Sequence, residues 1–543
     1  MGPVRTGDEL SFDVLVVGAG VAGLVAALTL AEEAPHLRVA VLDKGQIGSS
    51  GSTPLAQGGM AAAVGADDSP ALHAADTLRA GDGLGDERAV RILATEAPAR
   101  VADLERWGAR FDHDPAGAFS LAREGGQTVS RSVRAADATG AEIFRALRER
   151  ATGRLTRLQG VAVEPALAAA SPSRPLHGVW ALLDATEATP TGPAQEGGLA
   201  LVRARAVLLA TGGCGGLYAG TTNRDGATAD GVAFAWQAGA ELTDLEFVQF
   251  HPTGLKPRDG GESFWRLLLT EALRGAGAHL IDGEGHRFMP SRHPDAELAP
   301  RHVVAKAILD QPGGAWLDGR HLGARVWAEE FPTVLAGARR FGFDPLTEPL
   351  PVEPCEHYMI GGAATDLHGR TTVDGLWAAG EVACPGVHGA NRMAGNSLSQ
   401  SCVFGRRAAL SIAAWLDGRS EAAGDPHPPA LAPGDATDVS ATRAELRRVL
   451  SRGAGAVRSG AGLDEAAKAL DALAAAAPAA LPAHRDAIEL RNGLLVGELI
   501  VRAASLREES RGVHWREDFP GHDPRWERAH IRFSGTSEPH VRS

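Results

Sequence analysis

The sequence predicts an α/β protein whose Rossmann-like dinucleotide-binding domain is interrupted by a second domain and followed by a helical one. Three observations indicate this fold class. A glycine-rich turn near the start joins a strand-like run to a helix-like run, further apolar strand-like runs end in small residues, and alanine- and leucine-rich segments with helical periodicity occupy the C-terminal region. A chain of 543 residues is too long for one hydrophobic core, so several domains are expected.

The glycine-rich turn has the G-x-G-x-x-G spacing of dinucleotide-binding proteins, with Gly18, Gly20 and Gly23 at the three positions. In such a turn the first glycine permits a tight bend and the second lets the backbone approach a pyrophosphate. The third lets the following helix pack closely on the strand. The intervening residues are expected to face the same cofactor: Ala19, Val21 and Ala22.

The surroundings of this turn complete a βαβ unit. An apolar strand-like run at 12–17 precedes it, a helix-like run at 24–33 follows, and a second strand-like run at 38–42 ends at Asp43. The helix start offers N–H donors and a positive dipole to phosphates, and Asp43 is placed to accept from a ribose hydroxyl. Glycines reach this spacing by chance, but the two strands, the helix and the acid together predict a dinucleotide site.

Changes of pattern along the chain suggest its division into domains. Strand-like runs at 161–167, 199–210 and 376–381 belong with the βαβ unit, and the pattern changes at 245. The predicted parts are the first piece of the dinucleotide-binding domain at 1–244, an inserted domain at 245–357, the second piece at 358–417, a Pro- and Gly-rich linker at 418–440, and a three-helix domain with its tail at 441–543.

The bulk composition excludes some classes of function. Lys and Arg number 54 against 67 Asp and Glu, so the formal charge of −13 argues against nucleic acid and anionic membrane as partners. The N-terminal segment lacks an apolar signal region and no stretch is long enough to span a bilayer, which predicts a cytoplasmic protein. The cysteines form no C-x-x-C pair, so no metal site is expected: Cys214, Cys355, Cys384 and Cys402.

Small polar loops supply further candidates for cofactor contact. After Asp43 the chain is rich in Gly, Ser and Thr up to Gly59, and such a loop can wrap a planar cofactor closely. The candidates in it are Lys44, Ser52, Thr53, Gln57, Gly58 and Gly59. Other polar residues are ambiguous on their own. His251 alone would be read as a packing residue, Arg301 as a surface charge, and Glu124 as part of a solvated turn.

Ten ordered segments together resemble the succinate dehydrogenase/fumarate reductase flavoprotein family over nearly the whole chain. They read GAGVAG, STPLAQGG, REGG, FVQFHPTG, TEALRG, RHVVAKA, HYMIGG, AAGEV, HGANRMAGNSL and ESRGVH. The resemblance implies FAD as the cofactor, and it makes the inserted domain an α+β capping domain over an FAD-binding domain.

Two positions distinguish members within this family. Ser52 stands where succinate dehydrogenases and fumarate reductases carry a flavin-linked histidine, so FAD should be noncovalent. Glu124 would repel succinate or fumarate, but it can meet the ammonium of an amino acid. The chain therefore most resembles members that oxidise L-aspartate to iminoaspartate for NAD biosynthesis. Oxygen or fumarate would be the electron acceptor, and the resemblance leaves a quinolinate synthase open as a partner.

The resemblance also implies roles in substrate binding. Arg392 should bind one substrate carboxylate through two parallel hydrogen bonds. The residues expected to hold the other carboxylate, with Gln249 and Glu271 close by, are His251, Thr270 and His357. Arg301 is implied as the proton donor or acceptor, and its role stays open because arginine keeps its proton in nearly all proteins.

Four more residues are implied as cofactor contacts. Asp230 and Glu381 should meet polar groups of FAD. The helix that begins near Ser397 and Leu398 should direct its N–H groups at the flavin and stabilise the reduced anion.

The sequence departs from the family pattern at two positions, and it leaves two alternative functions open. Gln127 replaces a histidine that is common after R-E-G-G, and Lys306 replaces an arginine. One alternative is the flavin subunit of a membrane complex that passes electrons to an iron–sulfur partner, against which Ser52 speaks. The other is an FAD-binding protein without catalysis.

Overall fold

The computed structural model describes residues 10–45, 51–168, 175–185, 197–258, 264–419, 425–432, 439–477, 481–535 and 539–542. Some predicted segments fall partly outside these ranges. They are Ser49 and Ser50 of the small polar loop, most of the predicted loop at 190–198, and parts of the linker at 418–440.

The dinucleotide-binding domain is built on the predicted βαβ unit. Strand β1 (Ser11–Val17) lies between β2 (Val39–Asp43) and β8 (Gly198–Leu209), parallel to both, and helix α1 (Val21–Glu33) connects β1 to β2. Strand β15 (Leu376–Ala378) extends the parallel sheet beside β8. Parallel strands buried on both faces require continuous apolar runs, and β2 is buried along its full length. The α/β fold class is confirmed.

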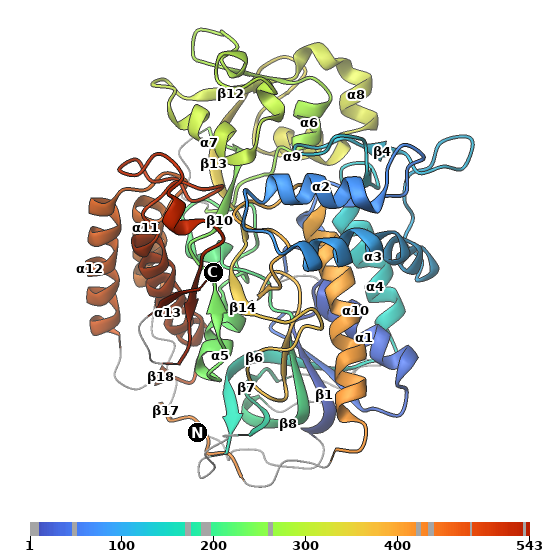
Figure 1. Cartoon of the computed structure of the whole chain (residues 1–543), viewed down its shortest axis with the longest axis vertical. Coiled ribbons are helices and arrows are strands. Elements are labelled where there is room, and N and C mark those ends of the chain that lie inside the picture. Colours follow the sequence, from blue (N-terminus) through green and yellow to red (C-terminus); the bar gives the residue numbers. More distant parts are fainter. Residues whose placement is uncertain are drawn as a thin grey trace.

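Two long strands leave this sheet and form a second layer. The first part of β6 (Thr156–Leu167) pairs with β2, and its second part pairs with β7 (Leu176–Leu183). In the same way β8 pairs with β7 before it pairs with β1. The strand β7 was not predicted, and it joins two strands that were. This antiparallel layer is visible at the base of the molecule in Figure 1.

Helices cover one face of the parallel sheet. Helices α1 and α10 (Asn396–Leu416) pack on each other through Leu24, Val403 and Phe404, all almost fully buried. The further helices of this side are α2 (Pro70–Ala80), α3 (Glu87–Arg106) and α4 (Thr139–Ala151). Three short strands form a small sheet beside them: β3 (Met60–Ala61), β4 (Leu121–Ala122) and β5 (Ser132–Val133). The opposite face carries α5 (Asp230–Gln237).

The inserted domain lies above the sheet in Figure 1 and has its own hydrophobic cluster, centred on Leu269, Leu317 and Trp327. Its antiparallel sheet has the order β10 (Val248–Leu255), β13 (Leu350–Met359), β12 (Ala315–Asp318) and β11 (His279–Ile281). Its helices are α6 (Glu271–Gly275), α7 (Arg301–Leu309), α8 (Gly323–Glu329) and α9 (Pro332–Arg340). The pairing of β10 with β13 closes the insertion near its two predicted ends.

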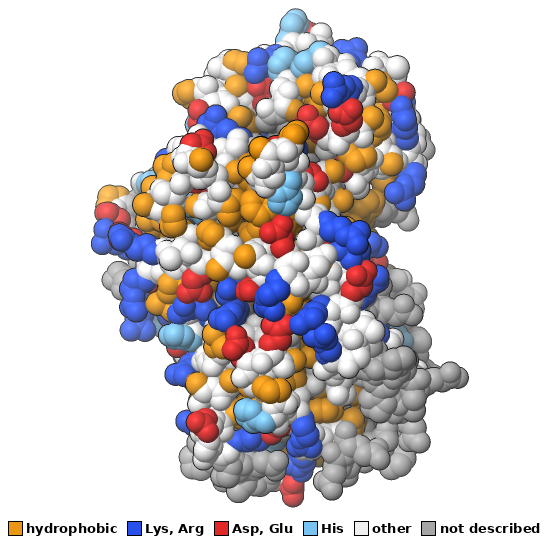
Figure 2. Space-filling model, turned by 90° about the vertical axis from the view of Figure 1, so that its right-hand side faces the viewer, with side chains coloured by type: hydrophobic (Ala, Val, Ile, Leu, Met, Phe, Trp, Pro, Cys, Tyr) orange, Lys and Arg blue, Asp and Glu red, His pale blue; other side chains and the backbone are white. Residues whose placement is uncertain are grey.

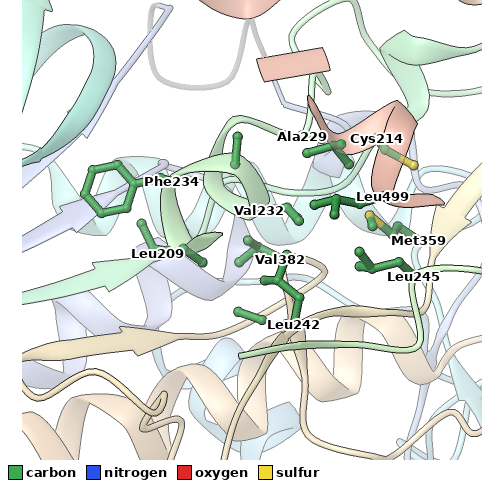
Figure 3. Packing of buried hydrophobic residues seen from close by; sticks show 14 of the residues in the cluster. Leu209, Cys214, Ala229, Val232, Phe234, Leu242, Leu245, Met359, Val382 and Leu499 are labelled. Atoms are coloured by element: carbon green, nitrogen blue, oxygen red, sulfur yellow. The ribbon is translucent and has the colours of Figure 1, made fainter. Parts of the chain in front are cut away.

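The C-terminal region contains the three predicted helices, α11 (Ser440–Gly453), α12 (Gly460–Ala476) and α13 (Arg485–Leu506). They share one hydrophobic cluster with the dinucleotide-binding domain. Figure 3 shows Leu499 of α13 close to Val232 of α5 and to Met359 of β13. The helical region is thus packed directly against the element that carries Asp230.

The end of the chain returns to the dinucleotide-binding domain as two strands that were not predicted. A five-stranded sheet has the order β16 (Ala383–Cys384), β14 (Gly362–Ala364), β9 (Leu242–Thr243), β19 (His530–Phe533) and β20 (His540–Arg542). Within the predicted linker, β17 (Leu431–Ala432) pairs with β18 (Leu481–Pro482). The short 3₁₀ turns are Thr53–Leu55, Gly215–Leu217, Met289–Ser291, Ala296–Leu298, Arg320–Leu322 and Pro524–Trp526.

Where Figure 2 colours the visible face, acidic and basic side chains are interspersed, with hydrophobic side chains between them. Among the described residues, no helix combines the length and the apolar character that crossing a membrane requires. The four cysteines are buried and unpaired.

Candidate active site

The glycine turn after β1 is a tight cradle that excludes larger residues. Gly18 has a φ of +105°, and a Cβ atom there would lie 2.3 Å from the carbonyl oxygen of Ala210. A Cβ atom at Gly23 would lie 2.0 Å from the carbonyl oxygen of Gly18. Both positions therefore require glycine, as the predicted close packing of helix on strand demands. Helix α1 begins beyond Gly20, which makes no side-chain cap.

A cavity of about 1520 Å³, open mouth included, starts at this cradle and runs under the inserted domain. The start of α1 lines it at one place and the start of α10 at another. Helix α10 follows Gly395, and it too has no side-chain cap. The Val21 N–H donates to Thr53 Oγ1 at 3.3 Å, and neither helix start is capped by the side chain of its own N-cap residue. The two helix starts thus offer two positive ends along one elongated cavity. This arrangement fits FAD: the start of α1 would hold its pyrophosphate, and the start of α10 would stabilise the negative charge of the reduced flavin ring.

Most of the predicted cofactor residues line this cavity. They are Gly18, Ala19, Gly20, Val21, Ala22, Asp43, Lys44, Ser52, Thr53, Asp230, Glu381, Ser397 and Leu398. Gly23 instead packs α1 on the sheet. Gln57, Gly58 and Gly59 lie outside the lining, and the Gly59 N–H donates to Glu124 Oε1 over 3.1 Å.

Glu381 is a half-buried acid in the cavity wall. Its Oε1 accepts from the Met359 N–H at 2.8 Å, and burial raises its pKa to about 8. The carboxyl group is therefore mostly protonated at neutral pH and can donate a hydrogen bond to a cofactor carbonyl or ring nitrogen.

Arg392 and His357 stand where the cavity reaches the inserted domain. Arg392 is 4% exposed, its guanidinium lies over the Tyr358 ring at 4.6 Å, and Nη1 donates to Ser397 Oγ over 3.3 Å. Burial and the nearby Arg301 charge lower the pKa of Arg392 to about 10, so it stays charged at neutral pH. Among the described residues Arg392 forms no ion pair, and its Nε has no hydrogen-bond partner. A buried guanidinium without a counter-charge is energetically costly, so we expect an anionic ligand from outside the chain to pair with it.

Two neutral histidines lie beside this arginine. The rings of His251 and His357 meet edge to face with centroids 5.1 Å apart. Burial, strengthened by the Arg301 charge, lowers the pKa of both well below the ordinary value. Thr222 Oγ1 lies 2.7 Å from Nδ1 of His357, and Nδ1 of His251 accepts from the Thr253 N–H at 3.3 Å. Within the described part of the chain no hydrogen bond reaches Nε2 of either ring, so each Nε2 is left for a ligand.

Arg301 belongs to a chain of buried charges at the far side of the site. Its Nε donates to Glu271 Oε2 at 2.8 Å and its Nη1 to Gln249 Oε1 at 3.0 Å. Arg274 lies 3.7 Å from the same carboxylate. Burial would raise the pKa of Glu271, but the two arginine charges outweigh it and hold the pKa below its ordinary value. Thr270 caps α6, its Oγ1 accepting from the Ala272 N–H.

The R-E-G-G loop brings Glu124 to this group. Besides the bond from Gly59, the backbone N–H of Glu124 donates to Gln127 Oε1 at 3.0 Å. Gln127 is fixed in turn by its bond to Ser132 Oγ at 2.9 Å, so the residue that departs from the family pattern supports the loop. Burial and the Glu271 charge raise the pKa of Glu124, while the Arg301 and Arg392 charges act against this.

The structure therefore gathers residues that are far apart in sequence. Glu124, Gln249, His251, Thr270, Arg301, His357 and Arg392 are all buried or nearly so and form one polar group at the end of the cavity. Only His357 and Arg392 of these line the large cavity itself. Sequence reasoning missed Thr222, Tyr358 and Asn391, although each is a neighbour in sequence of a residue or motif that it had selected. Asn391 belongs to the group because its Oδ1 accepts from Gln249 Nε2 at 3.0 Å.

The chain matches known families along most of its length. Residues 13–398 match the FAD binding domain family, and 443–538 match the fumarate reductase flavoprotein C-term family. An L-aspartate oxidase of Streptomyces coelicolor is 46% identical over 97% of this chain and 92% of its own length. One of Mycobacterium tuberculosis is 42% identical over 94% and 92%.

Solved structures show the same fold. A quinol fumarate reductase of E. coli superposes with a TM-score of 0.87 at 29% identity, covering 98% of this chain and 96% of that one. Sdh1 of Mycobacterium smegmatis gives a TM-score of 0.82 at 32% identity, covering 98% and 94%.

Proposed function

We infer the chemistry of the site from one premise: the chain belongs to the succinate dehydrogenase/fumarate reductase flavoprotein family and, within it, to the L-aspartate oxidases. Its reaction is the FAD-dependent oxidation of L-aspartate to iminoaspartate, the first step of NAD biosynthesis towards quinolinate, with oxygen or fumarate as electron acceptor. We propose the residue roles that follow. When bound, FAD accepts the hydride from the substrate carbon. The side chains bind and orient the substrate and transfer protons.

The single observation that carries the proposal is the buried, unpaired guanidinium of Arg392 at the end of the cofactor cavity. Tyr358 supports its flat face, so the N–H edges stay available to a substrate carboxylate. A planar fork fixes the orientation of the substrate as well as attracting it, which places the reacting carbon relative to the cofactor.

The second carboxylate is assigned to the two neutral histidines and Thr270. We take the Thr222 hydroxyl as the donor to Nδ1 of His357, which puts the ring proton on Nε2, where it can donate to the substrate. The same logic applies to His251, whose Nδ1 already accepts a hydrogen bond. Neutral donors suit this place, because Arg301 and Arg392 already supply the positive charge.

Glu124 is assigned to the substrate ammonium. The charges of both Arg301 and Arg392 act on this carboxylate, so it can balance them when a zwitterionic substrate enters. Arg301 is assigned to proton transfer in the fumarate direction, where it donates a proton, and we assign to Glu271 and Arg274 the relay of a replacement proton from solvent back to it.

Anaerobic L-aspartate should bleach the flavin of the purified protein, whereas succinate, L-glutamate and D-aspartate should reduce it far more slowly. The reason is that Arg392, the histidines and Glu124 select two carboxylates and an ammonium at fixed spacing. The absorbance near the flavin maximum is followed after mixing each compound with enzyme. Flavin that stays oxidised with L-aspartate contradicts the proposal, and faster reduction by succinate favours the dehydrogenase-type alternative.

Acid precipitation should release all the flavin as free FAD. Ser52 lines the cavity where a flavin-linked histidine is common in the family, and a serine side chain cannot form that link. Flavin fluorescence is compared between the supernatant and the washed pellet. A fluorescent pellet would show a covalent bond and refute the noncovalent assignment.

We also propose a cytoplasmic location, which the four buried, unpaired thiols support. Iminoaspartate is an imine that water hydrolyses, so an enzyme that consumes it at once, such as a quinolinate synthase, is the partner we propose.

A further inference from the structure

Lys44 connects the cofactor cavity to the C-terminal helices. The residue follows Asp43 at the end of β2 and lines the cavity, with its side chain only 16% exposed. Its Nζ donates to Asp230 Oδ2 at 2.6 Å, to Thr228 Oγ1 at 2.7 Å and to Glu489 Oε1 at 3.1 Å. An ammonium has three donors, and all of them are engaged by the protein. Lys44 therefore shapes the cavity wall and does not reach for a phosphate.

The partner Glu489 belongs to α13, far from the dinucleotide-binding domain in sequence. Its second oxygen accepts from Arg443 of α11 at 3.2 Å, so the carboxylate joins both helices to Lys44. Burial would lower the pKa of Lys44, but the Asp230 and Glu489 charges outweigh it and raise the pKa above its ordinary value. The ammonium thus stays charged in the cavity wall.

A second contact from α13 reaches the same wall. Asn492 lies one turn beyond Glu489, and its Nδ2 donates to Asp230 Oδ1 at 2.9 Å. Residues three apart on a helix share a face, so both side chains of α13 meet the pair of cavity residues together. Figure 1 shows α13 next to α5, the helix that begins with Asp230.

We propose that Glu489 and Asn492 are positioning residues of the FAD site. They hold Lys44 and Asp230 in the conformation that closes the cavity wall, so FAD binding and the seating of α11–α13 stabilise each other. Coupling of this kind is reciprocal: whatever the helices add to FAD affinity, FAD adds to the stability of the docked helices. The inference requires FAD as cofactor but not L-aspartate as substrate.

The competing explanation is a purely structural contact. Helix α13 is already anchored by apolar packing, with Leu499 beside Val232 and Met359 (Figure 3). If the polar contacts only add to that anchor, their loss lowers stability equally with and without FAD. The affinity for FAD then does not change.

The test measures FAD affinity and helix protection, and it needs no turnover. Glu489→Gln keeps the shape of the side chain and removes its charge, and Asn492→Ala removes one hydrogen bond and keeps the ion pairs. Titration of apoprotein with FAD, followed by flavin fluorescence, should give a Kd raised about tenfold for Glu489→Gln and a smaller rise for Asn492→Ala. The matched control is Glu498→Gln on the same helix, whose side chain is 47% exposed and faces Arg502 at 3.6 Å. Its Kd should equal that of the unmodified protein.

Hydrogen exchange supplies the reciprocal measurement on the unmodified protein. FAD should slow exchange of the amides of α13, and Glu489→Gln should lose most of this protection. Unchanged Kd values in both variants would overturn the proposal. So would identical exchange of α13 in the apoprotein and the FAD-bound protein, a result that decides the question even if Glu489→Gln does not fold.

Discussion

Arg392→Leu should retain FAD and lower kcat/KM for L-aspartate by about 100- to 1,000-fold or more. Removing one partner of a buried charge pair costs roughly 3–5 kcal/mol, because the substrate carboxylate then enters a desolvated place without its counter-charge. Leucine fills a similar volume without adding a polar group. The flavin spectrum and the acid-released FAD establish that the cofactor is bound, and steady-state kinetics give the effect.

Arg392→Lys is the control that separates charge from geometry. A lysine keeps the positive charge but cannot form two parallel hydrogen bonds to a carboxylate. Its loss should lie between those of the unmodified enzyme and the leucine variant. A leucine variant with nearly normal kcat/KM would remove Arg392 from the substrate site and leave its unpaired guanidinium without an explanation.

Glu124→Gln should lower L-aspartate oxidation without lowering fumarate reduction. Oxidation of L-aspartate should fall by about 10- to 100-fold, since a hydrogen bond to a charged group contributes roughly 1.5–3 kcal/mol. Fumarate has no ammonium, so its reduction by a reduced dye should be unchanged or faster once a nearby negative charge is gone. The bond from Gly59 to Oε1 can survive in the variant, because the amide oxygen of glutamine also accepts.

The pH dependence of kcat/KM for L-aspartate provides a second test of the role of Glu124. Burial and the Glu271 charge raise the pKa of Glu124, so this carboxylate takes up a proton at a higher pH than an ordinary glutamate. Only the anion can meet the ammonium, and kcat/KM for L-aspartate should therefore fall as the pH drops through that pKa. In Glu124→Gln this acid limb should disappear. Equal losses of both activities together with a lower Tm would mean that Glu124 has only a structural role.

The sequence predicts well what local pattern determines. The βαβ unit follows from neighbours in sequence, because the glycines, the apolar runs and Asp43 all lie within one supersecondary unit, and the structure confirms it. The three C-terminal helices follow from their periodicity in the same way.

The polar site could not be assembled from pattern alone. Arg301 and His251 look like an ordinary surface charge and an ordinary packing residue until the fold places them with Arg392, and only family resemblance selected them beforehand. Their individual roles stay predictions. The contacts of Lys44 with Glu489 and of His357 with Thr222 join residues more than a hundred positions apart, and single-sequence patterns carry no signal for such pairs.

The pairing of β9 with β19 joins segments far apart in sequence, and this affects how the chain folds during its synthesis. Leu242 and Thr243 of β9 face Phe533 and Arg532, so this edge finds its neighbour only when roughly 290 further residues have left the ribosome, about 15 to 60 seconds at roughly 5–20 residues per second. Until then the backbone N–H and C=O groups on this edge of β9 lack their partner strand and can pair with another chain. The strand that covers this edge is thus translated roughly 290 residues after the edge itself.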